Sequence, residues 1–300
     1  MKHTKHLLHR EYLFILISLL ITLLVTAFAL QLLHKELTVK RAITKKIDYD
    51  AFRKIRLDEE DIRQAKLQSE RILNKYPKLY KKPYMDQLGC LTFSMMTSSY
   101  DLINSRLADD EILQMGIGKL AQTTQFKEVY NYYKAIIGDL KYFPVPKTSG
   151  KKADVSYVDS WYQPRKYGGD RKHEGTDLMA SNNKSGYFPV VSITDGAIEK
   201  MGWLEQGGYR IGIRSVSGGY FYYAHLASYA PELKEGDTVI AGQLIGFMGD
   251  TGYGEEGTTG QFDVHLHLGI YINTENGEMS VDPYPILKML ETSRTVCLKK

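Results

Sequence analysis

The sequence predicts three structural parts: an N-terminal transmembrane helix, a small all-α segment, and a mainly-β domain built as an antiparallel sheet or a partly open barrel. Three observations lead to this prediction. They are an uncharged apolar run near the N-terminus, a three-four apolar periodicity in the first half, and period-two runs between glycines in the second half. We place the boundaries at residues 1–34 for the transmembrane helix, 35–140 for the helical region, 141–292 for the β-rich domain and 293–300 for a tail.

Composition and charge exclude several classes of protein. The 300 residues are 43% hydrophobic and 25% charged, an ordinary globular composition that excludes a disordered, collagen-like or multi-span membrane chain. The net charge of +4 is small, and no basic block interleaved with aromatic residues occurs outside the N-terminal flanks, so we expect no nucleic-acid partner. The 26 glycines concentrate after residue 150, which indicates a loop-rich second half.

Residues 12–33 form an apolar run without any charged side chain. About 20 apolar residues span a bilayer as a helix, because each residue rises about 1.5 Å. Ala27 and Ala29 resemble a signal-peptide cleavage site, but the run is long for a signal peptide and no polar stretch precedes these alanines. We therefore expect an uncleaved, single-pass anchor in the cell membrane, with secretion after cleavage as the alternative. Both interpretations place residues 35–300 outside the cytoplasm.

The spacing of apolar residues predicts helices over residues 47–140. From Ile62 to Tyr76 they recur three and four residues apart and line one helix face. The acidic residues 58–61 lie where a helix dipole favours negative charge. Further helices are expected near residues 85–105, 108–121 and 124–138. The region contains no histidine and no phosphate-binding loop, so we interpret it as a spacer or regulatory bundle whose protein partner, if any, the sequence does not identify.

The two cysteines, Cys90 and Cys297, lie far apart and exclude both a disulfide-rich scaffold and a CxxC metal site. We expect a buried thiol at Cys90 and a free thiol in the tail. A single bridge between the two is the alternative for a protein outside the cell.

A linker rich in proline, glycine and lysine at residues 144–152 precedes a change to period-two patterning. Short β-type runs follow, separated by glycine-rich turns, as in an antiparallel sheet or a partly open barrel. The runs cover residues 196–201, 210–215, 220–225, 238–240, 244–248 and 264–271.

Four of the eight histidines lie in this β-rich half, in contexts that metal chemistry requires. Side chains alternate along a strand, so His265 and His267 should project together from the face opposite the core. His173 and Asp177, four residues apart in extended chain, should also share a face. Imidazole and carboxylate groups both suit Zn²⁺.

His225 lies in a third β-type run, and by strand parity it should share a face with Phe221 and Tyr223. Taken together, the four histidines and the aspartate are more informative than any single motif. Two histidines and one aspartate complete a three-ligand zinc site with an open fourth position. The other two histidines then remain as candidates for general acid–base catalysis and for stabilising a negative charge in the transition state.

An ordered series of motifs covers the β-rich half. It comprises HEGTDLMA at 173–180, TDGAI at 194–198, YAHL at 223–226, the hairpin GDTVIAGQLIG at 236–246, GDTG at 249–252, HLHLGI at 265–270 and VDP at 281–283. Over about residues 143–290 this series resembles the zinc metallopeptidases of the lysostaphin and LytM type, peptidase family M23. The order and the spacing of the motifs argue against accidental similarity.

The resemblance implies a LytM/lysostaphin-like β domain that binds one Zn²⁺ per chain. It implies His173, Asp177 and His267 as zinc ligands, and His225 and His265 as a catalytic pair that does not bind the metal. His265 would act on the attacking water and His225 on the oxyanion, or the reverse. The resemblance implies a zinc endopeptidase that hydrolyses peptide bonds of peptidoglycan. Together with the apolar run at residues 12–33, it predicts a membrane-anchored, extracytoplasmic enzyme.

Tyr167 lies six residues before His173, where some family members place a tyrosine near the oxyanion. The resemblance therefore implies a catalytic role for Tyr167, although Tyr162 is close by.

The segment 253–263 departs from the family pattern, because it is longer and more acidic than the neutral loop usually found there. It leads into the 264–271 strand, so we expect it to border the cleft. Carboxylates of Glu255, Glu256 and Asp263 would then favour a cationic group on the substrate. The alternative is a solvated surface loop.

Two other functions fit parts of the sequence. Some relatives of this fold are inactive scaffolds that organise cell-wall enzymes, but these typically lack a ligand or a catalytic histidine, whereas this chain keeps the full set. Residues 235–243 also resemble the hairpin of lipoyl and biotinyl carriers. A carrier needs a lysine at the following turn, and the turn at 248–250 has none.

Overall fold

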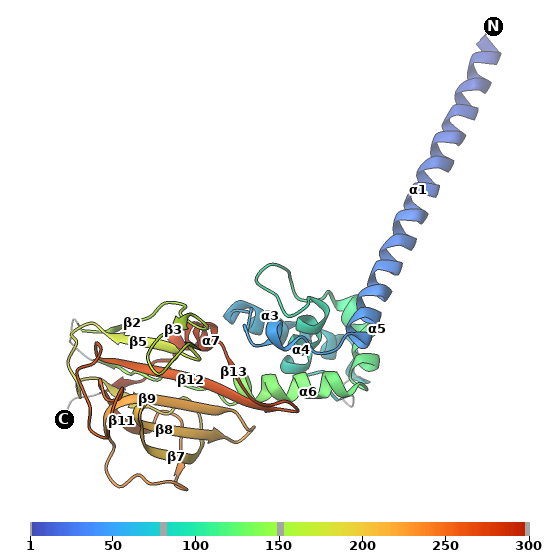
Figure 1. Cartoon of the computed structure of the whole chain (residues 1–300). Helices are drawn as coiled ribbons and strands as arrows, with labels where there is room; N and C mark the ends of the chain where they lie inside the picture. The colour runs from blue at the N-terminus through green and yellow to red at the C-terminus, as the bar shows by residue number, and fades with distance from the viewer. Residues whose placement is uncertain (1, 79–82, 149–152, 298–300) are drawn as a thin grey trace.

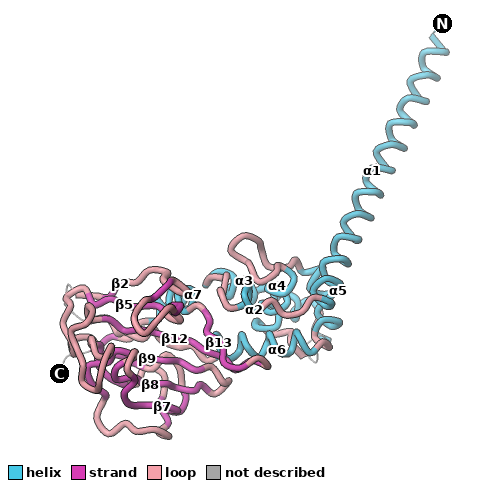
Figure 2. The backbone as a smooth tube through the Cα atoms, in the orientation of Figure 1, coloured by secondary structure: helices cyan, strands magenta, loops and turns pink. Residues whose placement is uncertain are grey.

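The computed structural model describes residues 2–78, 83–148 and 153–297 (Figure 1). A long helix, a group of shorter helices and a β-sheet domain follow one another along the chain, as the tube in Figure 2 also shows. The predicted fold class is therefore confirmed. Residues 149–152 of the expected linker and residues 298–300 of the expected tail lie outside the described residues.

Helix α1 (Lys2–Thr44) contains the one described segment that is long and apolar enough to cross a membrane, and its apolar window is fully exposed. Its last turns differ, because Val39 and Ala42 are buried and Lys35 forms an ion pair with Glu111. The helix thus continues past residue 34, where we placed a boundary, and packs on α5 (Asp110–Leu120). Gly116 permits this close approach, since a Cβ there would lie 2.6 Å from a Val39 methyl.

The helical region also contains α2 (Tyr49–Phe52), α3 (Glu59–Lys75), α4 (Gln87–Thr97) and α6 (Thr124–Tyr133), which runs into the π-helix η2 (Lys134–Gly138). Asp58 and Asp61 form a reciprocal capping box that begins α3 at the acidic cluster. Helix α4 ends earlier than the expected residue 105, because Ser99 and Tyr100 both adopt left-handed backbone conformations.

Cys90 lies on α4 and is a free, fully buried thiol. Burial raises the pKa of this thiol to about 12, so it is neither ionised nor accessible at neutral pH. The expected buried thiol is confirmed, and Cys90 takes part in no disulfide. The expected free thiol of Cys297 lies outside the side chains that the structure describes.

The β domain is built on a ten-stranded antiparallel sheet in which β10, β7, β8, β9, β12, β5 and β2 are successive neighbours. Strand β11 pairs with β6 and with β9, and β13 pairs with β12. The strands are β2 (Val155–Ser156), β5 (Thr176–Ala180), β6 (Pro189–Val191), β7 (Gly196–Leu204), β8 (Gly208–Ser215), β9 (Tyr220–Tyr229), β10 (Thr238–Val239), β11 (Leu244–Met248), β12 (His265–Thr274) and β13 (Gly277–Val281).

Strand β12 lies near the middle of this sheet and shows the predicted alternation. Leu266, Leu268 and Ile270 are fully buried in the core, whereas His265 and His267 point to the opposite face. Helix α7 (Pro283–Leu290) follows β13 and contributes Ile286 to the same core.

The last described residues pair with the β domain. Strand β14 (Val296–Cys297) pairs in parallel with β1 (Lys147–Thr148), and Arg294 donates to Asp154 at 2.6 Å. The described part of the expected tail is therefore structured.

Arg53, just after α2, joins the helical region to the β domain. Its guanidinium donates to Oγ of Ser280 at 2.6 Å and to the Tyr162 hydroxyl at 3.0 Å, and its carbonyl accepts from the Asp282 N–H at 2.8 Å. Nη2 of the same guanidinium lies 3.8 Å from Oε1 of Glu174. In the sequence, Glu174 lies between two of the expected zinc ligands. The helical region thus supports one wall of the β domain.

We expect Arg53→Ala to lower the free energy of unfolding by roughly 2 kcal/mol, because the side chain is only 13% exposed and makes several charged hydrogen bonds. Denaturant unfolding of the full chain in detergent measures this loss. Arg63→Ala is the matched control, since its pair with Glu60 is solvent-exposed and should contribute less than about 1 kcal/mol. Equal effects of the two substitutions would contradict the interpretation of Arg53 as a joint between the two parts.

Candidate metal centre and catalytic cleft

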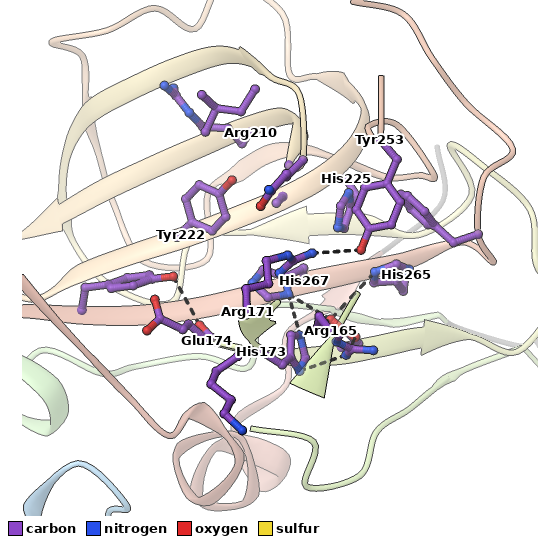
Figure 3. Close-up of a pocket in the computed structure, with 18 of the residues that line it drawn as sticks. Arg165, Arg171, His173, Glu174, Arg210, Tyr222, His225, Tyr253, His265 and His267 are labelled. Carbon is purple, nitrogen blue, oxygen red and sulfur yellow. Dashed lines mark hydrogen bonds and ion pairs between the residues drawn. The ribbon is translucent and has the colours of Figure 1, made fainter. Parts of the chain in front are cut away.

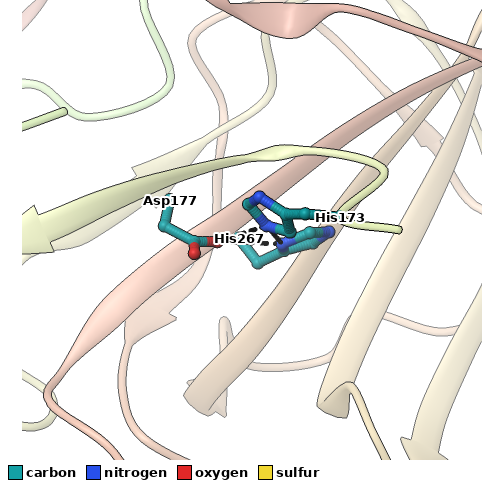
Figure 4. Close-up of side chains that lie close together, drawn as sticks. All are labelled: His173, Asp177 and His267. Atoms are coloured by element: carbon teal, nitrogen blue, oxygen red, sulfur yellow. Dashed lines mark hydrogen bonds and ion pairs between the residues drawn. The ribbon is translucent and has the colours of Figure 1, made fainter. Parts of the chain in front are cut away.

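Three side chains converge where β5 and β12 pair (Figure 4). The antiparallel register sets Asp177 directly opposite His267, and His173 approaches from the segment before β5. One ligand atom from each residue lies within 4.8 Å of the others. Gly175 allows this, because a Cβ at that position would lie 2.4 Å from the His267 ring.

The donor atoms of these residues face one another. Asp177 Oδ1 lies 3.0 Å from His173 Nε2 and 2.9 Å from His267 Nδ1. Burial disfavours the charged carboxylate, but hydrogen bonds from the two imidazoles outweigh burial and hold the pKa of Asp177 well below its usual range. Two imidazole nitrogens and one carboxylate oxygen at such distances are the donor set of a zinc site with an open position, so the residues fit this ion.

A second layer of contacts orients the three side chains. His173 Nδ1 lies 2.9 Å from the Ser160 carbonyl, to which it can donate, and this leaves Nε2 free for a metal. Arg165 Nη2 donates to Asp177 Oδ2 at 2.7 Å, which leaves Oδ1 facing the histidines. Our sequence reasoning missed Arg165, because no local pattern connects it to residue 177.

His225 and His265 lie beside this cluster, with ring centroids 4.7 Å apart. His265 Nδ1 is 2.7 Å from the Asp263 carbonyl, and His225 Nδ1 is 2.8 Å from the Thr251 carbonyl. Each ring therefore presents Nε2 to the cleft when Nδ1 donates to its carbonyl. Burial lowers the pKa of His225 well below its ordinary value, so this imidazole is neutral.

The expectation that His225 shares a face with Phe221 and Tyr223 is wrong. Those two side chains are fully buried in the core, whereas His225 lines the cleft. Between the pairs Tyr209–Leu226 and Ile211–Tyr223, β8 has one residue and β9 has two, which is a β-bulge. His225 takes φ +61° within this bulge, and the extra residue turns its side chain to the other face.

The five side chains line a cleft of about 780 Å³ (Figure 3). Tyr162 and Tyr253 also line it, but Tyr167 does not. The Tyr167 ring stacks on Tyr253, with centroids 3.9 Å apart and planes 2° from parallel. Tyr167 thus packs against Tyr253 without lining the cleft itself. The catalytic role of Tyr167 stays a prediction.

The loop at 253–263 borders the cleft with aromatic side chains and not with carboxylates. Tyr253 and Phe262 line the cleft and pack together at 4.8 Å between centroids, whereas Glu255 and Glu256 are exposed outside it. The expectation of acidic groups facing the substrate is therefore wrong. Packing of the two aromatic rings against the histidines turns the carboxylates to solvent.

Several known proteins resemble this chain in sequence and in fold. The model of the family described as Peptidase family M23 matches residues 171–283, a stretch that contains all five of the residues above. The L-Ala–D-Glu endopeptidase of Bacillus subtilis (strain 168) is 37% identical over 207 residues, which are 67% of this chain and 59% of that protein. A solved structure from Ruminococcus gnavus ATCC 29149, assigned as a glycyl-glycine endopeptidase lytM, is 41% identical with a TM-score of 0.68 and covers 88% of this chain and 99% of its own. The chain belongs to peptidase family M23.

This M23 chain differs from its relatives in extent. Lysostaphin of Staphylococcus simulans is 37% identical over 118 residues, which are 39% of this chain and 21% of that protein. The chain spans about 59% of the length of the B. subtilis endopeptidase. The likeness to the R. gnavus structure covers 88% of the M23 chain, more than the β domain alone supplies, so the helical region belongs to the shared fold.

Proposed function

We propose that this chain is a zinc metalloendopeptidase that hydrolyses peptide bonds of peptidoglycan. The observation that carries the proposal is the two-histidine, one-aspartate donor set with His225 and His265 beside it in one cleft. The substrate class is supported by two relatives, one named as an L-Ala–D-Glu endopeptidase and the other assigned as a glycyl-glycine endopeptidase.

The proposed mechanism assigns separate tasks to the side chains. His173, Asp177 and His267 would hold Zn²⁺, which when bound supplies a Lewis acid for the scissile carbonyl and activates a water. The Nε2 atoms of His225 and His265 are available to the cleft, so one imidazole could accept a proton from the water and later donate it to the leaving amine. The other imidazole would face the carbonyl oxygen that becomes negatively charged. It can donate to that oxygen from Nε2 when its ring is protonated, because Nδ1–H is already committed to a backbone carbonyl.

The test is digestion of isolated peptidoglycan by the purified full chain in detergent with added zinc. Mass spectrometry of the released muropeptides should show new amino termini in stem peptides or cross-bridges. A chelator should stop the release, and added zinc should restore it. Zinc binding without any released peptide would instead support the inactive scaffold.

We also propose that α1 anchors the protein in a membrane, with the cleft outside the cytoplasm. The support is an apolar stretch whose side chains are exposed, followed by turns of the same helix that are buried in the helical region. N-terminal sequencing of the membrane fraction should show an intact α1. A mature form that begins near Leu30 would replace this proposal by secretion after cleavage.

A further inference from the structure

We infer that the cleft contains a subsite for a carboxylate of the substrate peptide, with Arg210 as its anchor and Arg171 as a second donor. The inference rests on the proposed function, because it describes the substrate of the same cleft. Nothing in the metal centre or in the histidine pair requires these two arginines.

The balance of charge in the cleft favours an anionic ligand. Four cationic side chains line it, namely Arg165, Arg171, Lys172 and Arg210, against the three carboxylates of Glu174, Asp177 and Glu278. Two of these carboxylates are engaged, Asp177 by Arg165 and Glu174 by Arg53. Among the described residues, neither Arg171 nor Arg210 forms an ion pair with a carboxylate.

Arg210 supports the subsite more strongly than Arg171 does. Its Nη1 atom is buried and has no hydrogen-bond partner among the described residues. A buried guanidinium nitrogen without a partner is costly, because its lost hydration is not replaced. A planar carboxylate is the group that matches the guanidinium fork with two parallel hydrogen bonds. Because Arg210 lines the cleft, a substrate carboxylate bound there would pair with a guanidinium that no carboxylate of the described residues engages.

The position of Arg210 fits a substrate subsite near the metal centre. It lies on β8 opposite the bulge of β9 that carries His225, and β9 in turn pairs with β12 at His267. Two strand spacings separate β8 from β12, so the backbone of Arg210 lies about 10 Å from that of His267. In an extended peptide this distance is about three residues. The carboxylate thus belongs to a residue close to the scissile bond.

Arg171 lies on β4 (Arg171–Lys172) and lines the same cleft (Figure 3). Its guanidinium donates to the Tyr253 hydroxyl at 3.1 Å and to the Tyr167 carbonyl at 3.1 Å. Both acceptors are neutral, so its positive charge stays uncompensated. Arg171 therefore adds attraction for an anion without being committed to a protein carboxylate.

The test compares three synthetic stem peptides. The first is L-Ala–γ-D-Glu–L-Lys with both carboxylates free, the second carries a carboxamide in place of the D-Glu α-carboxylate, and the third carries a carboxamide at the C-terminus. Binding is measured by calorimetry with the zinc-loaded full chain in the His265→Ala background, and kcat/KM is measured with the parent chain. We expect the first peptide to have an affinity and a kcat/KM at least about tenfold higher than those of one of the two carboxamides. The carboxamide that loses affinity identifies the carboxylate that the subsite recognises.

Arg210→Gln should remove this discrimination, mainly through KM. Arg210→Lys keeps the charge but not the fork and should give an intermediate preference. Lys200→Gln, an exposed charge on the neighbouring strand β7, is the matched control and should keep full discrimination. Equal affinity of all three peptides for the chain without an arginine substitution would overturn the inference. This outcome does not depend on whether an arginine variant folds. Discrimination in binding without cleavage would support the subsite and overturn only the proposed function.

Discussion

Replacement of His173, Asp177 or His267 by alanine is expected to reduce bound zinc from about one ion per chain to none after dialysis. Each substitution removes one of the three proposed ligands, whose donor atoms lie within 4.8 Å of one another. Structural zinc is held in small peptides by about 10–16 kcal/mol, so the loss of one ligand in three should cost roughly 3–5 kcal/mol, or two to four orders of magnitude in Kd. Elemental analysis and competition with a chelator measure both quantities.

Asp170→Ala is a suitable control for this set, because Asp170 is exposed and lies in the loop just before His173. It should leave the zinc content and the affinity unchanged. Normal zinc content in any one of the three ligand variants would remove that residue from the ligand set.

His225→Ala and His265→Ala are expected to keep the zinc and to lose roughly 10²–10⁴ of the catalytic rate, the usual contribution of a general acid or base. Neither imidazole is in the three-residue cluster, and each is held by a backbone carbonyl at Nδ1. Removal of either imidazole should therefore leave the geometry of the proposed zinc ligands intact. The readouts are zinc content beside kcat on a cleaved stem peptide.

His34→Ala, far from the cleft on α1, is the matched histidine control and should keep both properties. If His225→Ala or His265→Ala lost its zinc while a ligand variant kept it, the two sets of roles would have to be exchanged.

The sequence was most informative where neighbours along the chain decide the structure. Alternation along one strand is a local property, so the faces of β12 and the joint projection of His265 and His267 could be predicted. The start of α3 at Asp58 could be predicted for the same reason, since capping and dipole effects act within one turn.

Features that depend on distant pairing could not be predicted in this way. The side-chain direction of His225 depends on a bulge between β8 and β9, and parity counted along one strand cannot detect an unequal number of residues in its partner. The positions of Arg165 and Arg210 depend on contacts across the sheet that leave no local pattern. The loop carboxylates were misplaced because the packing of Tyr253 and Phe262, not the charge of the loop, decides which side faces the cleft.

Because α1 is one unbroken helix, it determines how far the cleft can lie from the membrane. With residues 12–33 in a bilayer, residues 34–44 rise about 16 Å along the helix axis. The last of these residues are buried against α5, so no flexible tether separates the membrane from the folded part. The cleft is then carried on a short, stiff stalk at a set height above the lipid surface. With the proposed anchor and the proposed activity, the protein would cleave only the layer of cell wall nearest the membrane, and the length of the stalk would set the depth of cleavage.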